Sequence, residues 1–152
     1  LRSLPGMAEA EFVRLGSMHR NTFLDSPELL DAGLMLEKTP GLFFAGQITG
    51  MEGYLGNIGS GLIAALGAAR LARGEEAAIP PDTTLLGALC RHVASSPARP
   101  FQPMKAEFGL LPPLVPARRK AERREAYAAR SAAAMETFRH NLPSTESSPT
   151  LT

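Results

Sequence analysis

The sequence predicts an α/β fold, because two short apolar strand candidates lead into a glycine-rich loop and then a helix. The candidates are "LMLE" at residues 34–37 and "LFFAG" at residues 42–46, with the turn-like "KTPG" between them. The loop "GQITGMEGY" follows at residues 46–54. In α/β proteins this order presents backbone N–H groups to a phosphate or another electron-rich ligand. A tight joint between strand and helix gives the same pattern without a ligand, so both interpretations stay open.

The first helix is expected over residues 57–73, with Gly74 as its stop. Apolar residues recur at helical spacing and predict a wide apolar face, made of Ile58, Leu62, Ala65, Leu66, Ala69 and Leu71. Residues 59–64, "GSGLIA", match a dinucleotide-binding fingerprint, but these glycines fall inside the helical pattern and do not follow directly on a strand. We interpret them as packing residues, and the first phosphate-binding loop is then missing from this chain.

Three further segments complete the chain. A second helix is expected to start with Asp82 as its N-cap and to run through Val93. Residues 97–116 are rich in proline and predict an extended segment. Residues 117–142 predict a third, basic helix with one apolar side, made of Ala128, Ala132, Met135, Phe138 and Leu142. The polar tail at residues 143–152 is expected to be disordered.

Composition excludes several classes of protein. The single cysteine, Cys90, excludes an internal disulfide framework and fits a reducing compartment. We expect no secretory signal, no membrane-spanning run and no metal site, because no cluster of His, Cys, Asp or Glu has ligand spacing. The chain begins at Leu1, so we expect it to be the remainder of a longer protein.

Charge is concentrated in the third helix, although the net charge of the chain is only +1. Clusters of lysine and arginine bind phosphate backbones without reading sequence, whereas an ordinary solvated helix face would look the same. The basic residues in question are Arg118, Arg119, Lys120, Arg123 and Arg124.

Four motifs, in this order, resemble the C-terminal part of the TrmFO family, the folate- and FAD-dependent tRNA uracil-5-methyltransferases of bacteria. They are "MHRNTFLDSPELL" (18–30), "GLFFAGQITGMEGY" (41–54), "SGLIAALGAARLARG" (60–74) and "FQPMKAEFGLLPP" (101–113). The resemblance runs from about residue 8 to residue 140. GidA flavoproteins share the second motif, and the first and last motifs favour TrmFO.

The resemblance implies an activity, cofactors and partners. The family places a one-carbon unit from methylenetetrahydrofolate on C5 of the T-loop uridine in tRNA, using FAD and electrons from NAD(P)H. The chain is then a cytoplasmic fragment that lacks the N-terminal part with the cysteine motif, so no catalytic residue is assigned here. Residues 1–96 would be the C-terminal part of a Rossmann-like FAD-binding domain, with α-helices following. The alternatives are a GidA-like FAD-dependent protein making a different uridine modification, or a non-catalytic module that binds tRNA or packs against a flavin domain.

Site residues carry over from the resemblance position by position. Gly46, Gln47, Gly53 and Tyr54 are expected beside the cofactor, mostly through backbone groups. His19, Arg20 and Asn21 would face the flavin or the substrate, or form a structural turn. The basic residues of the third helix would contact tRNA. The chain departs from the family at residues 56–59 and at Lys105 and Glu107, where the family more often has asparagine. Glu52 is interpreted as structural, Cys90 as a core residue and His92 as a helix-surface residue.

Overall fold

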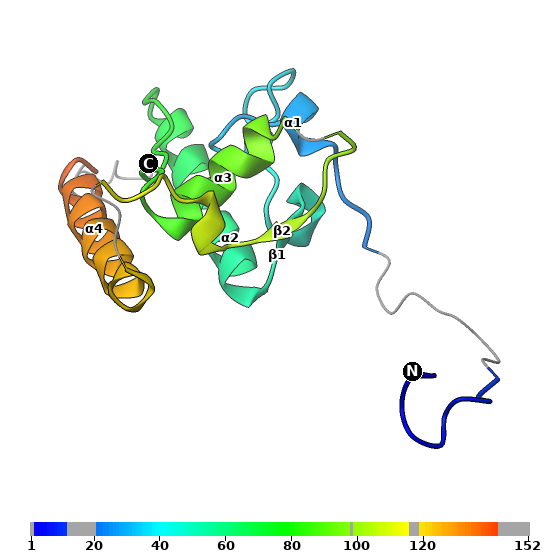
Figure 1. The fold of residues 1–152 in the computed structure, drawn as a ribbon. Helices are drawn as coiled ribbons and strands as arrows, with labels where there is room; N and C mark the ends of the chain where they lie inside the picture. The colour runs from blue at the N-terminus through cyan, green and yellow to red at the C-terminus, as the bar shows by residue number, and fades with distance from the viewer. Residues whose placement is uncertain (1, 12–20, 98, 116–118, 143–152) are drawn as a thin grey trace.

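The computed structural model describes residues 2–11, 21–97, 99–115 and 119–142, and in these ranges helices predominate over strands (Figure 1). Two short strands pair in parallel, with Met51 opposite Met104 and Glu52 opposite Lys105. The elements in chain order are α1 (Ser26–Leu29), the 3-10 turn η1 (Gly46–Thr49), β1 (Met51–Glu52), α2 (Tyr54–Ala72), α3 (Leu85–Ser95), β2 (Met104–Lys105), the 3-10 turn η2 (Phe108–Leu110) and α4 (Lys120–His140). The described chain is therefore helix-rich, with a small parallel sheet.

The two expected strands at residues 34–37 and 42–46 form an irregular hairpin instead of regular strands. Isolated antiparallel bridges join Leu30 to Leu36 and Met35 to Phe43. The side chain of Asp31 accepts hydrogen bonds from the N–H groups of Gly33 and Met35, and this turn bends the chain before the hairpin can extend. Leu34 has a φ of 67°, which interrupts the strand at that residue. The strand that precedes α2 is β1, which lies beyond both candidates.

Helix α2 begins at Tyr54, three residues before the expected start. Gly53 is its N-cap residue, with φ 83° and ψ 152°, and the Gly53 carbonyl accepts the first helical hydrogen bond from Asn57. The helix ends at Ala72. Gly74 follows with a φ of 71°, and its N–H donates a hydrogen bond to the Leu71 carbonyl. The expected glycine stop is therefore confirmed.

The buried face of α2 is made largely of small residues, and the apolar face expected from the sequence is mostly exposed within the described chain. Ile58 and Leu62 are 70% and 57% exposed within the described chain, and the buried residues are Gly56, Ser60, Ile63, Ala64 and Gly67. A Cβ at Gly59 would lie 2.8 Å from Leu86 Cδ1, and one at Gly67 would lie 2.8 Å from Phe43 Cε1. Close approach to these neighbours requires glycine, so the bulky side chains occupy the other face. The packing interpretation of "GSGLIA" is confirmed for Gly59, whereas a Cβ at Gly61 would meet no atom within 4 Å.

Helix α3 is capped by Thr84, two residues after the expected cap Asp82. The Thr84 hydroxyl accepts a hydrogen bond from the Gly87 N–H at 3.0 Å and donates one to the Pro81 carbonyl at 2.7 Å. A Cβ at Gly87 would lie 2.1 Å from that same carbonyl oxygen. The first turn of α3 is thus pressed against residues 80–81, and this contact selects Thr84 as the cap.

The main hydrophobic cluster lies between the hairpin, α2, α3 and the proline-rich segment. Its buried members are Leu34, Met51, Ile63, Leu89, Cys90, Val93 and Phe101. Phe101 also lies against Gly50, whose φ is 82°, and a Cβ at Gly50 would lie 2.5 Å from the Phe101 ring. This contact and the hydrogen bond from the Met104 N–H to the Gly50 carbonyl join the proline-rich segment to the loop before α2.

Helix α4 is anchored through Arg130 and Tyr127. The Arg130 guanidinium donates to the carbonyls of Pro112 and Pro113 at 2.7 and 3.3 Å, and lies 5.0 Å from the centre of the Tyr127 ring. Tyr127 stacks on Phe108. A groove of about 290 Å³ lies between α2 and α4, and four of the five residues expected on the apolar side line it: Ala132, Met135, Phe138 and, just beyond the end of α4, Leu142. Ala128 does not line it. Figure 1 shows α4 along one flank of the molecule.

By length and composition alone, α2 is apolar enough to cross a membrane, with a mean hydropathy of 1.3 over an 18-residue window. The expectation that no run is that long is wrong on this criterion, because the alanines between the bulky residues raise the mean hydropathy. A single such helix is weak evidence for a span, since core helices pass the same test.

Candidate functional site

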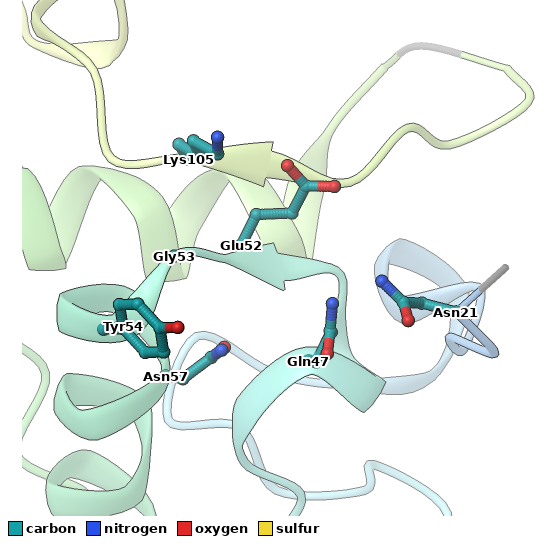
Figure 2. Close-up of a pocket in the computed structure, with 7 residues that line it drawn as sticks. All are labelled: Asn21, Gln47, Glu52, Gly53, Tyr54, Asn57 and Lys105. Atoms are coloured by element: carbon teal, nitrogen blue, oxygen red, sulfur yellow. The ribbon is translucent and has the colours of Figure 1, made fainter. Parts of the chain in front are cut away.

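A polar cleft of about 470 Å³ opens at the start of α2 (Figure 2). Figure 2 shows Asn21 and Gln47 toward one end, Tyr54 and Asn57 toward the other, and Glu52 beside Lys105 on the paired strands. Its lining residues are Asn21, Gln47, Glu52, Gly53, Tyr54, Asn57 and Lys105. Amide, carboxylate, ammonium and phenol groups therefore surround one space.

A relay of hydrogen bonds fixes η1 against α2 below this cleft. The Ser60 hydroxyl accepts from the Gly46 N–H at 2.7 Å and donates to the Asn57 carbonyl at 2.8 Å. The Thr49 hydroxyl donates to the Gly46 carbonyl at 2.7 Å, and the Ser26 hydroxyl donates to the Thr49 carbonyl at 2.9 Å. Because Ser26, Thr49 and Ser60 are fully buried, these bonds hold Gln47 in a fixed place on the cleft wall.

The N-terminus of α2 opens on the cleft with its backbone donors free. The first helical hydrogen bond is donated by Asn57, no side chain caps the helix, and no acidic residue occupies its first turn. The N–H groups of Tyr54 and Leu55 therefore remain available, and the helix dipole adds a partial positive charge at this end. Such an end favours a ligand with carbonyl or anionic oxygens.

Two observations bear on whether a cofactor could be held here. A Cβ at Gly53 would meet only Lys105 Cγ, at 3.9 Å, so the glycine leaves its backbone open on the cleft side. The Asn57 side-chain oxygen is buried without a hydrogen-bond partner in the described chain, and a ligand donor would satisfy it. The residues present are thus compatible with a flavin or another heterocycle that carries both donors and acceptors.

The expected cofactor neighbours come together only in part. Gln47, Gly53 and Tyr54 line the cleft, and so does Asn21. Gly46 does not line it, and its N–H is already bound to Ser60, so it is not a direct donor to a ligand there. His19 and Arg20 lie outside the described residues.

Three lining residues were not predicted as site residues. From sequence alone Glu52 is interpreted as structural, and Asn57 and Lys105 only depart from the family pattern. For Asn57 the available signal was its position four residues after Gly53, within the first turn of a helix that starts earlier than expected. No local signal marks Lys105, because it reaches the cleft only through the register of β2 with β1.

The basic end of α4 presents an exposed cationic surface. Arg119 pairs with Glu122 at 2.7 Å and remains largely exposed, while Arg123 and Arg124 are exposed without a carboxylate partner among the described residues. Lys120 is the first residue of α4, and Arg118 lies outside the described residues. The pairing partner of Glu122 is Arg119, at spacing i,i+3.

Cys90 and His92 offer no reactive group to this site. Burial raises the pKa of the Cys90 thiol to about 11, which disfavours the thiolate, and the residue is fully enclosed in the core. His92 is half-buried and lies against the Phe101 ring, so its description as a surface residue is wrong. Among the described residues no group of three or more His, Cys, Asp or Glu could hold a metal ion.

Comparison with known proteins gives one family and several relatives. Residues 1–76 match the family described as glucose inhibited division protein A. The chain is 52% identical over 135 residues to a protein of Geobacter sulfurreducens, and 51% identical over 139 residues to one of Desulfitobacterium hafniense. A protein of Bacillus cereus is 48% identical over 141 residues. All three are named methylenetetrahydrofolate–tRNA-(uracil-5-)-methyltransferase TrmFO.

The extent of these matches defines what they cover. They include 89% to 92% of this chain but only 31% to 32% of the relatives, so the chain spans about a third of their length. The family match covers the first half of the chain, including the hairpin, the cleft loop and the whole of α2. The chain belongs to the glucose inhibited division protein A family, and over about nine-tenths of its length it is similar to TrmFO.

Proposed function

We propose that this chain is the C-terminal part of an FAD-dependent enzyme that methylates C5 of the T-loop uridine in tRNA, with methylenetetrahydrofolate as one-carbon donor and NAD(P)H as electron source. The observation that carries the proposal is the cleft at the start of α2, where Gln47, Gly53 and Tyr54 lie together. The names of the relatives support the choice of substrate and donor.

The cleft residues have distinct roles in this proposal. FAD, when bound, supplies the electrons that convert the transferred one-carbon unit into a methyl group. The free N–H groups at the start of α2 bind its carbonyl oxygens, Gly53 permits close approach of the backbone, and Gln47 and Asn57 bind its polar edge. Residues 1–96 then close a Rossmann-like domain whose first phosphate loop lies in another part of the protein.

The remaining partners follow from exposed surfaces. Leu55, Ile58 and Leu62 are 85%, 70% and 57% exposed within the described chain, which supports a contact with the preceding part of the same polypeptide. Arg123 and Arg124 on α4 support contact with tRNA phosphates. With tRNA and folate as its substrates, the proposed enzyme would act in the cytoplasm.

The proposal is tested with the complete protein that carries this chain. Unmodified tRNA transcript is incubated with the protein, FAD, methylenetetrahydrofolate and NADPH, and its nucleosides are then separated and identified by mass spectrometry. We expect 5-methyluridine, and we expect it only when the folate is present.

Two other results would replace this function. A GidA-like enzyme would give a uridine modification of different mass, with no 5-methyluridine. A non-catalytic module would bind the transcript and leave every uridine unmodified while FAD and folate are both present.

A further inference from the structure

Lys105 is the one cation among the described residues that line the cleft. Its position is fixed by the register of β2 on β1 and by the hydrogen bond from the Met104 N–H to the Gly50 carbonyl, at 3.0 Å. Its Cγ lies 3.9 Å from the place that a Cβ would take at Gly53. Lys105 forms no hydrogen bond or ion pair within the described chain, so its ammonium group remains available to a ligand.

Glu52 is the one carboxylate among the described lining residues, and it stands directly opposite Lys105 in the strand register. The two side chains do not form an ion pair, so each charge acts separately on whatever occupies the cleft (Figure 2). The start of α2 adds partial positive charge on the side of Lys105, with no acid in its first turn to offset it. The occupant is therefore selected by its charge as well as by its shape.

We propose that Lys105 sets the preference of this cleft for the reduced, anionic form of the flavin over its oxidised form, and that Glu52 opposes it. This inference rests on the proposed function, because it takes FAD as the occupant. Two-electron reduction with uptake of one proton converts the neutral ring system into an anion. An ammonium group within a few ångströms stabilises that anion and does little for the neutral ring.

The test measures the midpoint potential of FAD bound to the complete protein by dithionite titration against a reference dye. The dithionite supplies both electrons, and the solvent supplies the proton. Lys105→Met keeps the aliphatic stem and removes the charge. We expect it to lower the preference for reduced over oxidised FAD by about 3- to 10-fold, as for one charge at roughly 6 Å in a wet cleft. A tenfold loss corresponds to a potential about 30 mV more negative for a two-electron couple.

Matched variants test whether the midpoint potential shifts in the direction that the charge predicts. Lys105→Arg should restore the potential of the original protein, because the charge returns on a side chain of similar length. Glu52→Gln should move the potential in the opposite direction, since it removes the negative charge from the same wall. Lys38→Met removes one positive charge in the exposed turn at residues 37–41, outside the cleft lining, and should leave the potential unchanged. Should Lys105→Met not retain oxidised FAD, Lys105→Gln carries the same comparison.

The inference and the function beneath it fail in different ways. An original protein that binds no FAD overturns the proposed function and this inference with it. If the original protein binds FAD and catalyses, an unchanged potential in Lys105→Met, or an equal shift in Lys38→Met, overturns the role of Lys105 alone.

Discussion

Gly53 occupies a backbone conformation, with φ 83° and ψ 152°, that residues with a Cβ rarely adopt. We expect Gly53→Ala to lower the free energy of unfolding by about 1–3 kcal/mol and to weaken FAD binding in the complete protein, because α2 can no longer begin at the cleft. Gly61→Ala is the matched control, since Gly61 lies within α2 and a Cβ there would meet no atom within 4 Å. It should raise the unfolding free energy by up to about 1 kcal/mol. Urea denaturation of both variants checks the pair, and equal destabilisation would contradict the strain at Gly53.

Cys90 links stability to pH because its thiol is more acidic in the unfolded chain. The unfolded thiol ionises near pH 9.0, whereas burial raises the pKa of the folded thiol to about 11. Between these values the unfolded state binds fewer protons, so stability falls as pH rises from 9 to 11, by at most about 3 kcal/mol. Below pH 9 the contribution is fully present. Denaturation of the original chain and of Cys90→Ala across this range gives the difference, and parallel curves for the two would show that the thiol is not buried.

Helix α3 depends on its N-cap residue, and substitutions at residues 82 and 84 test which of the two is the cap. Thr84→Ala removes the acceptor for the Gly87 N–H and should cost about 1–2 kcal/mol, whereas Thr84→Ser should keep most of the stability. Asp82→Ala, at the exposed position that the sequence favoured, should change stability by less than about 0.5 kcal/mol. Thermal unfolding followed by circular dichroism compares the three. A larger loss at Asp82 than at Thr84 would reverse the assignment.

Helix α4 is held to the rest of the molecule through Arg130, and its N-terminal end presents exposed arginines. Arg123→Gln with Arg124→Gln should raise the KM for tRNA and leave FAD content unchanged. The log–log salt dependence of binding should also fall, by roughly one unit for each phosphate that the variant no longer neutralises. Lys38→Gln with Arg91→Gln removes the same charge from exposed positions outside α4 and should leave the salt slope close to that of the original protein. Affinities measured across a salt series decide this, and equal slopes for both pairs would mean that α4 presents an ordinary solvated face.

The elements differ in how far the sequence determines them. The existence of α2, α3 and α4 follows from local apolar periodicity and from stop signals such as Gly74, and all three were predicted within a few residues. The buried face of α2 could not be predicted in this way. Periodicity identifies the face with the large apolar side chains, whereas close contact with Leu86 and Phe43 requires glycine on the face that is buried. The cap of α3 was misplaced for a related reason, since Asp82 and Thr84 are both good caps until residues 80–81 press against Gly87.

At the scale of the whole molecule, the candidate site combines three segments that lie apart in the chain: Asn21, the loop and helix start at residues 47–57, and Lys105. The loop at residues 46–57 could be predicted from its glycines and its place before a helix. Lys105 could not, because only tertiary pairing of β2 with β1 carries it to the same cleft. The exposure of hydrophobic side chains on α2 likewise depends on tertiary packing and not on local sequence.

The isolated chain should lack most of its affinity for the cofactor. We expect the 152-residue chain to bind FAD weakly or not at all, because Gly59 and Gly61 lie inside α2 and the sequence offers no other fingerprint for a first phosphate loop. Gel filtration after mixing with excess FAD, read by flavin absorbance per protein, measures this. A chain that stays yellow through the column would show that the cleft alone holds the cofactor.

The exposed apolar face of α2 bears on the order of events during synthesis. If the chain forms the C-terminal part of the protein, as proposed, Leu55, Ile58 and Leu62 would leave the ribosome after the segments proposed to cover them have begun to fold. Docking of this helix would then be the closing step of biogenesis, and it would bring the start of α2 to the cofactor only once translation is nearly complete. A message truncated before this region would yield an open domain with exposed apolar surface, which chaperones and proteases remove, and not a flavin-loaded protein without activity.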